Sequence, residues 1–230
     1  MNDGLSVVLP LYNGAAFVQA AIQSIVEQQK LPPKWEIIVV DDGSADNGVK
    51  ICQKLAGLYP QIRVEQHPEN RGVAAARNRG AALARYEYLG FVDQDDRWMP
   101  DKWRVQFQVL RESNADYVLG YQQFELQNPL NPPNWFRQEW AKQPQKAFVF
   151  GGLLLQRTVF LSVGILQESL KFGWDDVDWF NRARESGLIE TIIEHVVLHR
   201  NVHDRNASAR TKQSHPELLR LIRAKLARQA

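Results

Sequence analysis

The sequence has a single cysteine, Cys52, among its 230 residues, so no disulfide can form within the chain. Disulfide-rich secreted domains are therefore excluded, and the composition fits a reducing compartment. No uninterrupted apolar run approaches the ~20 residues that a membrane-spanning helix needs. The first residues also lack a basic region followed by a long apolar stretch. We therefore expect a cytoplasmic protein without a signal peptide.

Excess charge and several familiar catalytic motifs are missing too. The formal net charge is only +2, so we expect no basic face for a duplex and no nucleic-acid partner. The chain contains neither GxGxxG nor GxxxxGKS/T, which excludes a dinucleotide fingerprint and a P-loop. It also lacks GxSxG, HExxH and CxxC, so a serine-hydrolase elbow and a zinc site are not expected.

The first half does contain a regular alternation of strand and helix patterns. Apolar runs of strand length occur at 5–12, 36–40, 62–66, 86–92 and 116–121. Helical spacing fills the intervals, at 15–29, 46–58, 72–85 and 99–112. Strands separated by helices predict an α/β fold with a mostly parallel, Rossmann-like sheet. Ligands of such sheets bind outside the carboxyl ends of the strands.

The second half is less regular. Residues 128–144 hold four prolines and two tryptophans and are typical of a long irregular segment. Beyond it we expect a strand at 148–156, a short helix at 157–163, a helix at 174–187, and one bent or two short strands at 189–198. The final segment, 210–230, predicts a basic amphipathic helix. Such a helix can lie on an anionic membrane, pack on the domain or contact a partner.

Three aspartates crowd the end of the fourth strand in the stretch FVDQDDRW: Asp93, Asp95 and Asp96. One of them would suffice as a helix cap. Three carboxylates favour a divalent metal site or a phosphatase-type nucleophile, whose DxDGT-like continuation is missing. Because alternate residues of an extended strand project the same way, Asp93 and Asp95 can address one bound group. This stretch alone leaves the cap and the metal site open.

Other polar segments also leave two interpretations open. DDGS, 41–44, suits a turn and a helix cap, or supplies Asp42 as an acceptor for a ligand N–H. In WDDVDW, 174–179, the aspartates suit the positive end of a helix dipole or supply a general base. His203, in LHRNVHDRNAS, is either a solvated loop residue or a ligand.

Seven segments occur in a fixed order: LPLYN (9–13), VVDDGSADN (39–47), NRGVAAARNRG (70–80), FVDQDDRWMPDKW (91–103), GGLLLQRTVF (151–160) followed by Gly164, WDDVDWFNRAR (174–184) and HRNVHDRNAS (199–208). Together they resemble a family 2 glycosyltransferase of GT-A fold, over nearly all of the chain except 128–144 and the last helix. The resemblance implies inverting transfer of a sugar from a UDP-type donor to an acceptor hydroxyl, with Mn²⁺ or Mg²⁺ as the cofactor.

The resemblance also implies roles for single residues. Tyr12 would stack on the base, and Asp42 would accept a hydrogen bond from a uracil-type N–H. Asp95 would be the metal ligand, with Asp93 facing the ribose or a metal-bound water and His203 completing the metal or diphosphate site. The whole nucleotide-sugar site is expected to comprise Pro10, Tyr12, Asn13, Asp42, Arg77, Asn78, Asp93 and Gln94.

Asp176 matches the family's catalytic base. The family usually has Glu-Asp where this chain has Asp175-Asp176, so either of the two is a candidate for the base. A glycan, lipid-linked or other hydroxyl acceptor would be recognised near Trp174, or by Trp135 or Trp140 of the irregular segment.

A single GT-A domain is expected over residues 1–209, with a nucleotide-sugar half (1–121) and an acceptor and catalytic half (122–209). The last helix, 210–230, would then be available for peripheral contact with the inner face of a membrane. Two rivals remain. A sugar-nucleotide nucleotidyltransferase should carry a glycine-rich, arginine-bearing loop after the first strand, where this chain has LYNGAAF. A non-catalytic sugar-nucleotide or glycan-binding relative should lack the metal carboxylates or the base.

Overall fold

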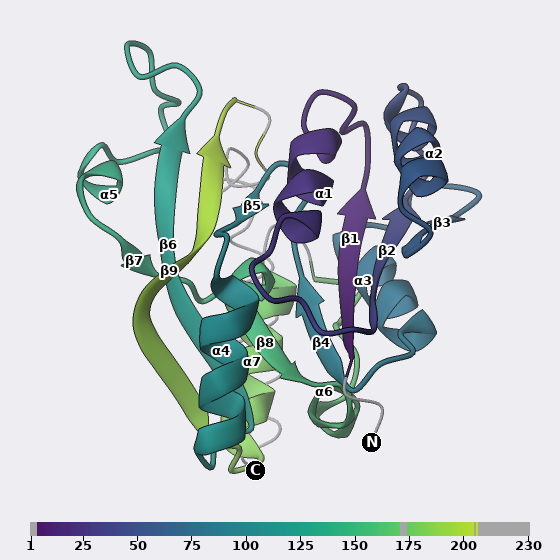
Figure 1. Ribbon diagram of the computed structural model, residues 1–230. Helices are drawn as coiled ribbons and strands as arrows, with labels where there is room; N and C mark the ends of the chain where they lie inside the picture. The colour runs from purple at the N-terminus through teal and green to yellow at the C-terminus, as the bar shows by residue number, and fades with distance from the viewer. Residues whose placement is uncertain (1–3, 171–173, 205, 207–230) are drawn as a thin grey trace.

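The computed structural model describes residues 4–170, 174–204 and 206 (Figure 1). Its strands are β1 (Leu5–Leu11), β2 (Trp35–Asp41), β3 (Ile62–Gln66), β4 (Tyr88–Phe91), β5 (Arg97–Trp98), β6 (Tyr117–Leu126), β7 (Gln145–Lys146), β8 (Leu153–Gln156) and β9 (Glu190–Val202). Its helices are α1 (Val18–Val26), α2 (Gly48–Leu58), α3 (Val73–Leu83), α4 (Lys102–Glu112), α5 (Glu139–Lys142), α6 (Arg157–Val163) and α7 (Trp174–Glu185), with one 3₁₀ turn, η1 (Phe150–Gly152).

The strands of the described residues form one nine-stranded sheet in the order β3-β2-β1-β4-β8-β6-β9-β5, with β7 paired to β6. β1 pairs in parallel with β2 and β4, and β2 pairs in parallel with β3. The chain therefore runs outward from β1 to β3 and then crosses to β4 on the other side of β1. Sheets with this reversal bind ligands at the carboxyl ends of the two strands where it occurs.

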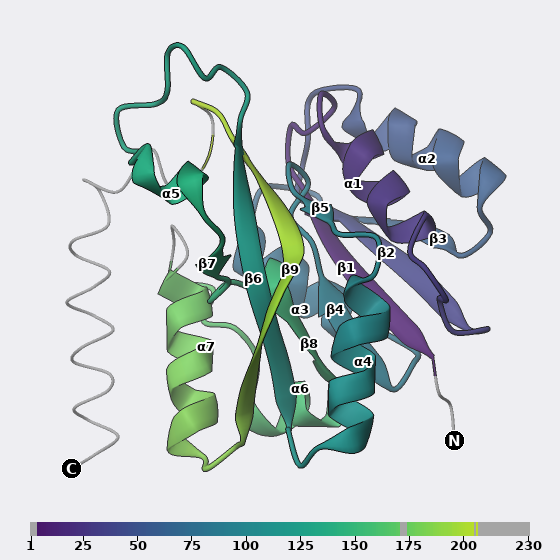
Figure 2. The same ribbon diagram turned by 60° about the vertical axis from the view of Figure 1, so that its left-hand side comes forward.

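Helices cover both faces of the sheet (Figure 2). On one face, Ile22 of α1 and Trp103 of α4 share a core with Val7 of β1. On the other face, Trp179 of α7 shares a second core with Val8 of the same strand. Neighbouring residues of a strand point to opposite faces, so the continuous apolar run of β1 supplies both cores. This is why its sequence shows no alternation of apolar and polar residues.

Helix α3 lies close against the sheet because its inner positions are small. Alanines occupy 74–76, and a Cβ atom on Gly80 would lie only 2.3 Å from a methyl group of Val8. The close approach carries two polar residues into the interior, since Arg77 is only 4% and Asn78 8% exposed. Charged residues are rarely buried so deeply without partners, and their partners define the candidate site.

The second half differs in places from the sequence-based prediction. β6 continues beyond residue 121 to Leu126 because it pairs with β9 along almost its whole length. Residues 190–202 form one strand, and irregular register next to Tyr121 accommodates its bend. Of the strand expected at 148–156, only Leu153–Gln156 is extended, and η1 precedes it. The two-residue strand β5 was not predicted at all.

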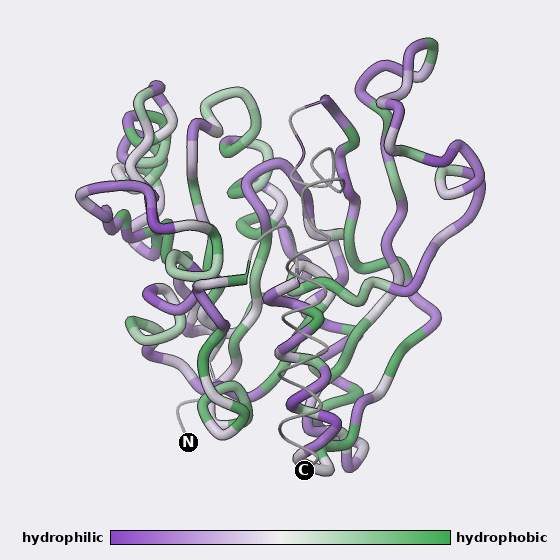
Figure 3. The backbone as a smooth tube through the Cα atoms, turned by 180° about the vertical axis from the view of Figure 1, so that it is seen from behind, coloured by the Kyte–Doolittle hydropathy of each residue, from purple (hydrophilic) through white to green (hydrophobic). Residues whose placement is uncertain are grey.

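The segment 127–138 stands away from the domain beyond β6 and is largely hydrophilic (Figure 3). It leads into the one-turn helix α5, where the sequence predicted only irregular structure. Among the described residues, no helix is both long and apolar enough to cross a membrane. The amphipathic helix predicted for 210–230 lies outside the described residues, and so does any membrane contact through it.

Candidate active site

Polar side chains follow three neighbouring strands at one end of the sheet. Tyr12 follows β1, Asp42 follows β2 and Asp93 follows β4 by two residues. β1 and β2 are paired in register up to Leu11 and Asp41, so the first two groups leave the sheet side by side. Pro10 lies within buried β1, next to this end. Most of the sequence-predicted nucleotide residues thus lie at the carboxyl ends of parallel strands, whereas Arg77 and Asn78 lie on α3.

Tyr12 is the exposed member of this group, with 47% of its surface accessible. Its backbone is held by the side-chain amide of Gln94. The Tyr12 N–H donates to Gln94 Oε1 at 2.7 Å, and Gln94 Nε2 donates back to the Tyr12 carbonyl at 3.0 Å. Asn13 has a positive φ of 49°; its N–H donates to Ser44 Oγ of the DDGS turn, and its Oδ1 accepts the N–H of the next residue, Ala45. An exposed aromatic ring is therefore presented on a fixed backbone.

Asp42 is buried and holds the start of α3. Its Oδ1 accepts hydrogen bonds from His67 Nδ1 at 2.8 Å and from the Arg71 N–H at 3.0 Å. Its Oδ2 accepts one from the Gly72 N–H at 2.7 Å. Gly72 has a positive φ of 96°, which favours glycine. Asp42 is therefore compatible with both interpretations of DDGS. It holds the start of a helix by hydrogen bonds, and it still has unused lone pairs for a ligand N–H.

Arg77 is surrounded by three carboxylates. Its guanidinium lies 2.6 Å from Asp93 Oδ1, 2.6 Å from Asp176 Oδ1 and 3.2 Å from Asp175 Oδ2. The side chains of Arg77, Asp175 and Asp176 are 4%, 0% and 6% exposed, whereas that of Asp93 is 30% exposed. The guanidinium also lies over the ring of Phe150, 5.4 Å from its centre. One buried cation thus joins the end of β4 to the start of α7.

The charges in this cluster perturb one another. Burial raises the pKa of Asp176 to about 7; Arg77 opposes the shift, and the charges of Asp175 and Asp93 add to it. Burial also raises the pKa of Asp175. Burial opposes the charge of Arg77, but the three carboxylates together raise its pKa. A carboxylate that titrates near neutral pH is suited to work as a general base.

A second acidic group lies further along the same loop. Asp95 Oδ2 is 3.0 Å from His203 Nε2 and 3.0 Å from Asn206 Nδ2, so two of the residues predicted as metal ligands meet. The described residues contain no cluster of three or more potential metal-binding His, Cys, Asp or Glu side chains. Asp96 is buried, accepts the Asn201 N–H at 3.2 Å and lies inside the fold.

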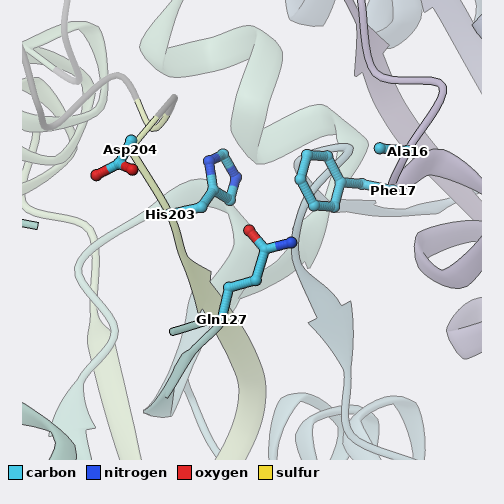
Figure 4. A pocket seen from close by; sticks show the side chains of 5 residues that line it. All are labelled: Ala16, Phe17, Gln127, His203 and Asp204. Carbon is cyan, nitrogen blue, oxygen red and sulfur yellow. The ribbon is translucent and has the colours of Figure 1, made fainter. Parts of the chain in front are cut away.

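The ring of His203 stacks on Phe17, with the ring centres 4.6 Å apart. A hollow of about 300 Å³ lies beside this pair, lined also by Ala16, Gln127 and Asp204 (Figure 4). The stacking fixes the imidazole plane on one side, and Asp95 fixes it at Nε2. The histidine is therefore oriented by the protein before any ligand binds.

Residues 6–159 match the profile of Glycosyl transferase family 2. The chain belongs to this family. It is 34% identical over 118 residues to the putative teichuronic acid biosynthesis glycosyltransferase TuaG of Bacillus subtilis strain 168, a match that covers 51% of this chain and 46% of TuaG. The chain therefore spans about half the length of this curated relative.

Two solved structures share the fold of this family 2 chain. TarS of S. aureus in complex with UDP-GlcNAc has a TM-score of 0.70 and 18% identity, covering 90% of this chain and 60% of TarS. The mannosyltransferase PcManGT from Pyrobaculum calidifontis, in complex with GDP-Man and Mn²⁺, has a TM-score of 0.70 and 19% identity, covering 91% of this chain and 60% of its own. The predicted α/β fold of GT-A type is thereby confirmed.

Asn78 uses both ends of its amide within the protein. Its Oδ1 accepts the Leu166 N–H at 2.9 Å, and its Nδ2 donates to the Leu166 carbonyl at 2.9 Å and to Glu168 Oε1 at 3.3 Å. These bonds tie α3 to the loop that leads toward α7. Its Oδ1 accepts only one of these bonds and retains a lone pair, and the contact of Asn78 with the donor stays a prediction.

The three tryptophans predicted at the acceptor side lie in two places. Trp174 is the first residue of α7, and its buried indole N–H has no partner among the described residues. Trp135 and Trp140 both pack edge-on against Phe136, with ring centres 5.8 and 5.7 Å apart. Trp135 and Trp140 therefore pack within the segment that follows β6 and includes α5. Their contact with an acceptor stays a prediction.

Sequence reasoning missed three contributors to the site. Phe150 donates its backbone N–H to Asp176 Oδ2 at 3.3 Å and carries Arg77 on its ring. Asn206 shares Asp95 with His203, and His67 holds Asp42. His67 and Phe150 lie outside the segments that carry the resemblance, and Asn206 lies within HRNVHDRNAS but had no role assigned, because each acts through a contact made by folding. Only the proximity of Asn206 to His203 in the sequence could have signalled its role.

Proposed function

We propose that this chain is an inverting glycosyltransferase that moves a sugar from a nucleotide-diphosphate donor, a UDP-sugar, to an acceptor hydroxyl. The observation that carries the proposal is the Arg77 bridge. It holds Asp93, on the donor side, and Asp176, the candidate base, at 2.6 Å each from one guanidinium. A donor at the strand ends and a base at the start of α7 then lie on two sides of a single side chain.

Asp176 is the better candidate for the base. Its side chain is 6% exposed, whereas that of Asp175 is completely buried. In the proposed step, Asp176 takes the proton of the acceptor hydroxyl while the acceptor oxygen bonds to the anomeric carbon. The bond from that carbon to the diphosphate oxygen breaks, and the nucleoside diphosphate leaves. Attack opposite to the leaving group inverts the configuration, and no covalent enzyme intermediate is needed.

The donor set around Asp95 fits Mn²⁺ or Mg²⁺. It combines a carboxylate with an imidazole nitrogen 3.0 Å apart, and Asp93 lies two residues away. One or two carboxylates with substrate phosphates and water make up many magnesium sites in enzymes, so two or three protein ligands suffice. When bound, the cation would neutralise the charge that develops on the departing diphosphate. Asp95 and His203 would hold it, and Asp93 would face the ribose or a metal-bound water.

The nucleotide would occupy the ends of β1 and β2. The exposed ring of Tyr12 offers a stacking surface, and Gln94 fixes the backbone that carries it. Asp42 would accept an N–H of the base. Trp174, beside the candidate base, would contact the acceptor. Relatives named for teichuronic acid and minor teichoic acid biosynthesis support a glycan or polymer acceptor within polysaccharide synthesis.

The test is nucleotide release. We expect UDP to appear when the protein is incubated with Mn²⁺ and one of UDP-glucose, UDP-galactose or UDP-GlcNAc, with GDP-mannose tested in parallel. Release should stop when the metal is chelated. No release from any donor, together with no metal-dependent nucleotide binding, would reject the proposal. Metal-dependent binding without release would favour a non-catalytic sugar-nucleotide-binding relative.

Asp95→Asn is expected to raise the Mn²⁺ concentration needed for half-maximal UDP release by at least about tenfold, because it removes a charged ligand from the cation. A manganese titration at fixed donor measures this change. Asp204→Asn is the control, since Asp204 is exposed and next to His203 in the chain. Equal manganese requirements for Asp95→Asn and the wild type would show that the cation binds elsewhere.

A further inference from the structure

His67 lies directly after β3, where it reaches the carboxylate at the end of the neighbouring strand. Its backbone N–H donates to the Asp41 carbonyl at 2.8 Å, continuing the pairing of β3 with β2. Its Nδ1 lies 2.8 Å from Asp42 Oδ1, and the two side chains are only 7% and 4% exposed. Both partners are therefore fixed by the sheet, and the contact is shielded from water.

The two carboxylate oxygens of Asp42 accept different numbers of hydrogen bonds. A carboxylate oxygen accepts about two hydrogen bonds. Oδ1 already has two donors, His67 Nδ1 and the Arg71 N–H, while Oδ2 has one, the Gly72 N–H. Among the described residues, the remaining capacity of this carboxylate is thus at Oδ2. A ligand N–H that approaches Asp42 would meet one oxygen in one orientation.

We propose that His67 is a positioning residue for nucleobase selection. It supplies the second hydrogen bond to Oδ1, beside the Arg71 N–H, so the unused acceptor capacity of the carboxylate lies at Oδ2, where an N–H on the edge of the base would bind. Uracil and guanine present such an N–H. Cytosine and adenine present a ring nitrogen lone pair at the equivalent place, which a carboxylate repels. The inference rests on the proposed function, because it assumes that a nucleotide binds at these strand ends.

The effect of losing His67 differs from that of losing a structural contact. Without the imidazole, each oxygen of Asp42 keeps one backbone donor, and Oδ1 regains an acceptor position, so a base N–H is no longer directed to Oδ2 alone. A base with an N–H then loses affinity, whereas a base with a lone pair does not. The phosphate end of the donor is untouched, so turnover at saturating donor should not change.

The experiment measures dissociation constants for UDP, GDP and CDP in the presence of Mn²⁺, by calorimetry, for the wild type, His67→Ala and His67→Asn. The wild type should bind UDP or GDP more tightly than CDP. His67→Ala should weaken that tighter nucleotide about tenfold, as expected for one charge-assisted hydrogen bond, and leave CDP unchanged. Asparagine keeps an N–H donor and should recover part of the preference. The donor KM should rise in His67→Ala while kcat stays constant.

His195→Ala is the matched control, because His195 also contacts an aspartate. Its Nε2 lies 3.0 Å from Asp101 Oδ1, but its side chain is far more exposed than that of His67. His195→Ala should change neither the affinity for UDP or GDP nor the affinity for CDP. Melting temperatures show whether each variant is folded. If His67→Ala keeps the wild-type ratio of affinities, or weakens UDP and CDP equally, the positioning role is refuted while the proposed function stands. If the wild type binds no nucleoside diphosphate, the proposed function fails, and the role of His67 fails with it.

Discussion

Asp176→Asn is expected to reduce sugar transfer by ~10²–10⁴-fold, the usual contribution of a positioned general base. Nucleoside diphosphate affinity should stay within a few-fold of the wild type, because Asp176 contacts Arg77 and the Phe150 N–H rather than Tyr12 or Asp42, the expected base-binding residues. The asparagine keeps an oxygen for one of these contacts but cannot take a proton. Steady-state rates and UDP calorimetry on the same preparation measure both quantities.

Asp175→Asn is the companion variant, since Asp175 is the neighbour in the chain and shares Arg77. It is expected to lose less activity, because its side chain is sealed from any acceptor. The reverse order, with Asp175→Asn inactive and Asp176→Asn active, would assign the base to Asp175. Loss of UDP binding in Asp176→Asn would mean that this carboxylate belongs to the donor site.

The pH dependence of turnover offers an independent check on the base. Burial raises the pKa of Asp176 to about 7 from its ordinary value of 3.8. A base must be ionised, so kcat/KM should rise as the pH increases through about 7 and level off above it. The same shift affects stability. Between pH 3.8 and about 7, Asp176 keeps its proton in the folded state but has lost it in the unfolded state. The contribution of this group to the free energy of unfolding therefore falls as the pH rises through this range. An activity profile flat from pH 5 to 8 would contradict the assignment.

The placement of the strand-end residues could be predicted from the sequence because it depends on local patterns. Strands alternating with helices imply a parallel sheet, and a parallel sheet brings the ends of its strands together. Tyr12, Asp42 and Asp93 each follow an apolar run, so their meeting at one end of the sheet required only the order of elements. Asp95 and His203 come together as expected, although 108 residues separate them.

The partners of Arg77 could not be predicted in the same way. They lie 16, 98 and 99 residues away, and their distances depend on how closely α3 approaches the sheet. That approach is permitted by Gly80 and the neighbouring alanines, whose effect on packing no motif expresses. The segment after β6 was predicted to be irregular, but its course and helix α5 were not predicted. Its course depends on aromatic contacts around Phe136 rather than on a periodic pattern.

Arg77→Met is expected to destabilise the protein by about 3–5 kcal/mol, the typical effect of removing one partner from a buried ion pair. The change leaves two buried aspartates, Asp175 and Asp176, and the partly exposed Asp93 without their shared cation. Activity should fall even where the variant is folded, because Asp176 loses the partner that orients it. Urea denaturation gives the free energy of unfolding, and donor turnover in the folded range gives the rate.

Arg71→Met is the matched control, because Arg71 pairs with Glu168 at the surface, where the two side chains are 51% and 38% exposed. Such pairs contribute less than about 1 kcal/mol. A double variant adds a sharper test. In the Arg77→Met background, Asp176→Asn removes one unpaired buried carboxylate and should restore part of the lost stability, so the two changes should be strongly non-additive. Additive losses, or an Arg77→Met variant as stable as Arg71→Met, would show that the buried carboxylates do not depend on the guanidinium and would remove the bridge from which the proposed function is argued.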